Sequence, residues 1–112
     1  MQQNTITIKV NLDETKMPEA IYWNASGSTA DEEQLAKGLL LGLWDGTDKS
    51  SPRIDLWTKD MMVDEMTDFF YQTFMGMANT YQKATNNVEL SNDIKTFAKT
   101  FYQKFREQEL KK

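Results

Sequence analysis

The sequence predicts an α+β fold, in which an antiparallel sheet of about four strands is followed by a C-terminal helical hairpin packed on one face of the sheet. Three observations support this. Near the N-terminus, apolar and polar residues alternate, which is typical of half-buried strands. In the second half, apolar residues recur at intervals of three and four, which is typical of amphipathic helices. The chain has 112 residues, so we expect residues 1–112 to form a single domain.

Four segments are predicted to be strands: residues 5–12, 20–25, 39–44 and 53–58. The first is the clearest, because every second residue from Ile6 is apolar. The third is also compatible with a helix, since residues 29–32 fit a capping box ahead of an apolar stripe. Against a helix, Gly38 and Gly42 would each cost a helix interior about 1 kcal/mol relative to alanine. We interpret it as a strand, with which a short helical lead-in over residues 31–37 would be compatible.

Two long helices are predicted at residues 60–84 and 89–107. We expect Asp60 to cap the first, because aspartate is favoured there and carboxylates suit the positive end of a helix. The short link between the helices predicts an antiparallel hairpin. The predicted buried stripes consist of Val63, Met66, Phe70, Phe74, Met77 and Tyr81 on the first helix and of Leu90, Ile94, Phe97, Phe101 and Phe105 on the second.

The composition excludes several kinds of chemistry. Cysteine and histidine are both absent, which excludes thiolate nucleophiles, Cys/His zinc sites and imidazole bases. A formal charge of −4 argues against binding to a nucleic-acid backbone, and no apolar run approaches the ~20 residues of a membrane span. We therefore expect a soluble, cytoplasmic protein without catalytic residues, cofactor or metal, and without direct membrane insertion.

An acidic cluster at the start of the first predicted helix could bind a hard cation, because Asp60, Asp64 and Asp68 share one helical side and Glu65 lies beside them. Acidic residues at a helix N-terminus also stabilise the helix itself, and no calcium-loop pattern surrounds them. The interpretation as a solvated helix end is favoured, and cation binding is left open.

Four residues are candidates for binding a partner. Met62 and Phe69 are seven residues apart and lie about 60–100° from the main apolar stripe, where a Met/Phe patch suits partner binding. The alternative is that a wide sheet covers this broader arc of the helix. Asp55 and Trp57 share one side of a strand with Arg53, so that a charged pair lies beside an aromatic residue.

Residues 53–61 (RIDLWTKDM), continuing through Gln72, Thr73 and residues 77–80 (MANT), resemble the GldC family of gliding-motility proteins of the Bacteroidetes. Residues 12–14 (LDE), 22–25 (YWNA) and 43–45 (LWD) extend the resemblance over most of the chain, and it is weakest in the C-terminal helix. It implies an accessory protein of gliding motility and the linked protein-export apparatus. It implies no reaction and no functional residue.

The favoured function is that of a non-catalytic adaptor, which binds protein partners of the motility and secretion machinery and for which self-association is left open. An alternative is a small-molecule binder or minor enzyme with a cleft between sheet and helices, using Asp55, Trp57 and Trp44. A third hypothesis is the general holding of unfolded clients.

Overall fold

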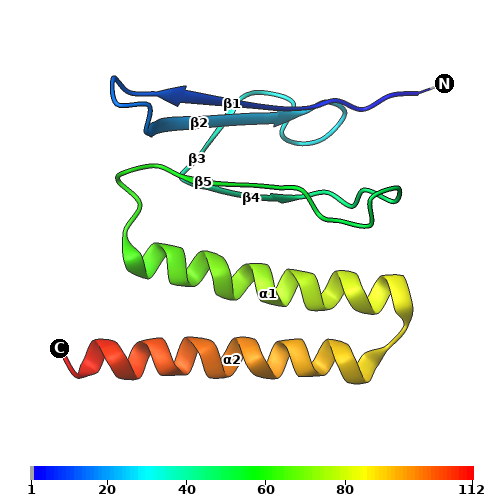
Figure 1. Cartoon of the computed structure of the whole chain (residues 1–112), viewed down its shortest axis with the longest axis vertical. Coiled ribbons are helices and arrows are strands. Elements are labelled where there is room, and N and C mark those ends of the chain that lie inside the picture. Colours follow the sequence, from blue (N-terminus) through cyan, green and yellow to red (C-terminus); the bar gives the residue numbers. More distant parts are fainter. Residues whose placement is uncertain (1) are drawn as a thin grey trace. The chain divides into compact units, whose positions relative to one another are not determined.

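The computed structural model describes residues 2–112, which contain five strands and two helices. The chain divides into two compact units, of which the first ends at Met61 and the second spans Met62–Lys112. The predicted class is confirmed, because antiparallel sheets precede a C-terminal helical hairpin (Figure 1). That residues 1–112 act as a single domain, and that the hairpin packs on a sheet face, stay predictions.

The first two strands form an antiparallel pair at the start of the first unit, β1 (Ile6–Leu12) and β2 (Pro18–Ala25). They lie side by side in Figure 1. Ile8 pairs with Trp23 and Val10 with Ile21, so that one face of the pair is apolar, as the alternation predicts. Ile21, at the centre of this face, is fully buried.

The third predicted strand begins one residue earlier and ends two residues earlier than expected, and a short strand that was not predicted precedes it. β3 (Gln34–Ala36) pairs with β2, and after Lys37 the chain continues as β4 (Gly38–Gly42), which pairs with β5 (Arg53–Trp57). The strands therefore form a three-stranded and a two-stranded sheet. The helical lead-in over residues 31–37 that would have been compatible with this strand does not form, because bends and β3 occupy the segment. The strand interpretation of residues 39–44 is confirmed for its first four residues.

The second unit consists of α1 (Val63–Thr85) and α2 (Val88–Leu110), which run antiparallel in Figure 1. Asn86 ends α1 in a left-handed conformation with φ 57°, and the Asn87 side chain caps α2 by accepting a hydrogen bond from the Leu90 N–H at 3.0 Å. The prediction that Asp60 caps α1 is wrong. Its carboxylate instead accepts a hydrogen bond from the Thr58 hydroxyl at 2.6 Å, and α1 begins after Met62.

Small residues form the seam between the two helices. Ala78 of α1 and Ser91 and Ala98 of α2 are fully buried, and the Ser91 hydroxyl donates a hydrogen bond to the Ala78 carbonyl at 2.7 Å. The predicted apolar stripes lie beside this seam, where the ring of Phe74 contacts the ring of Phe101 with centroids 5.3 Å apart. The helices thus approach closely at small residues and interlock through aromatic rings.

Candidate partner-binding surface

The predicted patch on α1 lies at its first two turns. Met62 is the residue before the helix, and 63% of its side chain is exposed, while its backbone N–H donates to the Glu65 carboxylate at 3.1 Å. Phe69 lies seven residues further on, close to the same side of the helix, and is half-buried. The start of α1 therefore presents a methionine and part of a phenylalanine ring to solvent.

The predicted residues of β5 lie on one face of the β4–β5 pair. The Arg53 guanidinium donates two hydrogen bonds to the Asp55 carboxylate, from Nε at 2.9 Å and from Nη2 at 2.8 Å. This pairing confirms the charged pair expected from the alternation. Trp57, two residues further along, is 53% exposed. An exposed indole beside a fixed ion pair offers both apolar contact and defined hydrogen-bonding groups to a partner.

Glycines of β4 lie opposite two of these side chains. Gly38 pairs with Trp57 and Gly42 pairs with Arg53 across the β4–β5 ladder. A Cβ atom at Gly42 would lie 2.7 Å from Nη1 of Arg53, closer than two such atoms can approach. The glycine thus allows the guanidinium to lie flat over β4 and reach Asp55.

The electrostatics of this pair do not suit acid catalysis. The hydrogen bonds from Arg53 lower the pKa of the Asp55 carboxyl and raise the pKa of the guanidinium. A carboxyl whose pKa is lowered stays ionised at neutral pH and has no proton to donate. The geometry therefore favours Asp55 as a fixed negative charge.

The four predicted residues divide between the two units of the chain. Asp55 and Trp57 belong to the first unit, and Met62 and Phe69 belong to the second. Each unit therefore carries one candidate surface, and the structure tests the binding role of neither.

The acidic residues near the start of α1 make local contacts. The Asp64 carboxylate accepts a hydrogen bond from the Glu65 N–H at 3.0 Å, and the Thr58 hydroxyl is the main cause that lowers the pKa of Asp60. Among the residues that the structure describes, no group of three or more acidic residues is arranged to hold a metal ion.

An apolar hollow of about 290 Å³ lies within the first unit, between its two sheets. Its lining residues come from both sheets and are all apolar or glycine: Ile6, Ile8, Ile21, Trp23, Ala36, Gly38, Leu39 and Leu41. Ala36, before the break at Lys37, and Leu39, after it, both line the hollow. Asp55, Trp57 and Trp44, which the small-molecule hypothesis used, do not line it.

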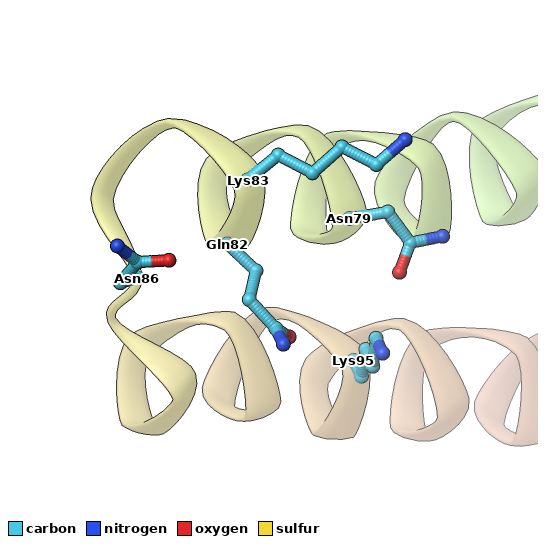
Figure 2. Close-up of a pocket in the computed structure, with 5 residues that line it drawn as sticks. All are labelled: Asn79, Gln82, Lys83, Asn86 and Lys95. Atoms are coloured by element: carbon cyan, nitrogen blue, oxygen red, sulfur yellow. The ribbon is translucent and has the colours of Figure 1, made fainter.

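A polar pocket of about 460 Å³ lies on the hairpin near the turn between α1 and α2 (Figure 2). Asn79 and Gln82 extend from α1 toward α2, and Lys83, Asn86 and Lys95 complete the lining. Its amides and ammonium groups contrast with the apolar side chains beside the helix seam, so the hairpin has chemically different sides.

A hydrogen-bonded centre that is not among the predicted site residues lies at Asp13, in the turn between β1 and β2. Its carboxylate accepts hydrogen bonds from the Thr15 N–H at 2.8 Å, the Met17 N–H at 3.0 Å and the Lys59 ammonium group at 3.0 Å. The contact with Met17, followed by those with Thr15 and Lys59, holds the pKa of Asp13 well below its ordinary value. Aspartate two residues before threonine is a turn signal, but Lys59 is too distant in the sequence to be recognised as a partner.

Fold and surface define a small α+β protein that carries large apolar and aromatic side chains at its surface. The family model described as gliding motility-associated protein GldC-like matches residues 18–107. The chain belongs to this family of gliding motility-associated proteins, as the resemblance of residues 53–61 indicated. No curated protein and no solved structure matches the chain. Within residues 2–112, neither helix is long and apolar enough to cross a membrane.

Proposed function

We propose that this protein is a non-catalytic accessory protein of the gliding apparatus and its linked protein-secretion machinery, located in the cytoplasm and acting through protein–protein contacts. Membership of the GldC-like family supplies the link to gliding motility. The contact role is our inference, and the exposed apolar side chains carry it. Among residues 2–112, the buried apolar residues are Ile21, Ala78 and Ala98, whereas Met62, Trp57 and many other large apolar side chains are exposed.

Met62 and Phe69 form the surface at which we propose that a protein component of the machinery binds. Methionine is flexible and polarisable, so it adapts to the shape of a partner, and an aromatic ring beside it adds contact area. The exposed Trp57 and the ion pair of Arg53 with Asp55 form a second candidate contact on β5.

Affinity purification from a gliding bacterium that carries a member of this family tests the α1 surface. The double variant Met62→Glu/Phe69→Glu is compared with Val88→Glu/Leu110→Glu, which adds the same two charges at exposed apolar positions of α2. We expect a motility or secretion component to copurify with wild type and with the control, and to be lost from the first variant while its circular dichroism is unchanged. Undiminished copurification with the first variant would refute this surface.

A second candidate function is supported by the apolar hollow of the first unit. With an entirely apolar lining and a volume of about 290 Å³, it suits a hydrocarbon ligand, such as part of an acyl chain. Ala36→Leu would place three more carbon atoms in the hollow and occupy part of it. A fatty acid that raises the melting temperature of wild type and leaves that of Ala36→Leu unchanged would support binding there, and equal shifts in both proteins would exclude it.

A further inference from the structure

The hairpin has an apolar face beside its seam, and we call it the hairpin face. It consists of Val63, Met66, Phe70, Phe74, Met77 and Tyr81 of α1 and of Leu90, Ile94, Phe97, Phe101 and Phe105 of α2, and none of these side chains is charged. Met77 and Phe97 directly precede the seam residues Ala78 and Ala98, so they point about 100° away from the seam. Their side chains are 53% and 57% exposed.

Aromatic contacts join the two stripes into one surface. The ring of Phe74 on α1 lies 5.6 Å from that of Phe97 on α2, and the ring of Phe70 lies 6.5 Å from that of Phe101. An apolar stripe of a helix must be covered by another element to leave water. The cross-helix ring contacts cover part of the two stripes, but Val63, Met77, Leu90 and Phe97 stay 45–69% exposed.

We propose that a second copy of this chain, in place of the sheet face expected from the sequence, covers the hairpin face, so that two hairpins form a four-helix bundle with two-fold symmetry. The hairpin face contains neither Met62 nor Phe69, and this proposal stands independently of the proposed partner surface. The distribution of charge along the helices and the size of the face favour a second copy as the occupant.

The charges on both helices suit pairing with an identical hairpin. α1 carries Asp64, Glu65 and Asp68 in its first two turns and Lys83 near its end. In α2, Glu89 and Asp93 lie near the start, while residues 99–112 contain five basic and two acidic side chains. A two-fold axis that brings the face against its own copy sets the facing helices antiparallel, so acidic starts lie opposite basic ends.

The face is close in size to that of a stable dimer interface. Each helix has 23 residues and is therefore about 35 Å long at ~1.5 Å per residue. Two helices of about 10 Å diameter side by side present a footprint of about 700 Å². A standard interface buries about 800 Å² of accessible surface per partner, so this footprint is close to the size that a stable dimer needs.

Sedimentation velocity over a range of micromolar concentrations tests the proposal with the full chain. Met77→Glu/Phe97→Glu places two charges in the hairpin face, at exposed positions where the folded hairpin can accommodate them. The control Leu35→Glu/Leu110→Glu adds the same charges at exposed positions outside the face. We expect wild type and control to sediment as dimers with about the same dissociation constant. The face variant should be a monomer at concentrations at least tenfold higher.

Each other outcome overturns the proposal. A wild-type chain that stays a monomer at the highest concentration has no second copy on this face, and a face variant that dimerises like wild type uses a different surface. Thermal unfolding tests whether the face variant is still folded. The melting temperature of wild type should rise with protein concentration, whereas the face variant should melt cooperatively at a temperature independent of concentration. Copurification of the motility component with the monomeric face variant would show that partner binding does not depend on dimerisation through the hairpin face.

Discussion

The hydroxyl of Ser91 in α2 donates a hydrogen bond to the carbonyl oxygen of Ala78 in α1, with 2.7 Å between the two oxygens and no exposure of either residue. This contact fixes the register of the two helices near their connecting turn. It also explains why a small polar residue occupies a fully buried position of the seam, where a larger side chain would push the helices apart.

Loss of this hydrogen bond should destabilise the hairpin. We expect Ser91→Ala to lower the free energy of unfolding by about 1 kcal/mol, because a buried hydrogen bond contributes about that much net. Ser91→Leu should cost more, since it adds volume where the helices touch. Urea denaturation measures both. Thr100→Ala, which removes an exposed hydroxyl on the same helix, is the control and should change little. Equal stability of Ser91→Ala and wild type would contradict the role of this contact.

Phe74 is the centre of the aromatic cluster, because its ring contacts those of Phe70, Phe97 and Phe101. We expect Phe74→Ala to reduce the free energy of unfolding by about 3 kcal/mol, through lost burial and lost ring contacts. Phe74→Leu keeps most of the volume and should cost clearly less. Chemical denaturation measures the free energy of unfolding of both variants. If both lose a similar, small amount relative to wild type, the aromatic cluster contributes little to stability.

Asp13 should make the stability of the first unit depend on pH. Its hydrogen bonds hold its pKa below the ordinary value of 3.8, so its contribution is fully present above about pH 4 and is lost as the pH falls further, toward the pKa of the folded state. Asp13→Asn should lower the urea midpoint of unfolding at neutral pH. It should also reduce the decrease of this midpoint that wild type shows at acidic pH. The control Glu14→Gln, in the same turn, should keep the wild-type pH profile. An Asp13→Asn profile parallel to that of wild type would contradict the assignment.

Gly42 should be needed for the ion pair on β5. A methyl group at this position would meet Arg53 Nη1 at 2.7 Å, and the flexible end of the arginine would move away from Asp55. We therefore expect Gly42→Ala to raise the pKa of Asp55 toward its ordinary value, measured by NMR titration of the carboxyl carbon. Gly46→Ala is the control, since a Cβ there meets nothing within 4 Å. An unchanged pKa of Asp55 in Gly42→Ala would mean that the pair does not need the glycine.

Much of the fold could be predicted from local patterns. The period of two from Ile6 predicted β1, and the recurrence of apolar residues at three and four predicted both helices. The break of the third strand at Lys37 could not be predicted, because it depends on pairing with β2 on one side of the break and with β5 on the other. The seam between the helices could not be predicted either. The periodic stripe consists of large apolar residues, whereas the helices meet at the small residues Ala78 and Ser91.

The candidate surface was predictable where it depends on neighbours in the sequence. Arg53 and Asp55 are two residues apart in a strand, so their pairing on one face follows from the alternation. The contact of Asp13 with Lys59 joins residues 46 positions apart, and no pattern in the sequence indicates it. Met62 and Phe69 were chosen by their position off the stripe, and their binding role stays a prediction.

The most direct test of the central claim, that this GldC-like protein acts in gliding through the contact surface at the start of α1, is a complementation assay. A gliding strain that lacks its GldC-like gene would receive wild type, Met62→Glu/Phe69→Glu or the control Val88→Glu/Leu110→Glu, and colony spreading would be measured at equal protein levels. We predict that wild type and control restore spreading and that the Met62/Phe69 variant does not. Full spreading with that variant would contradict the account.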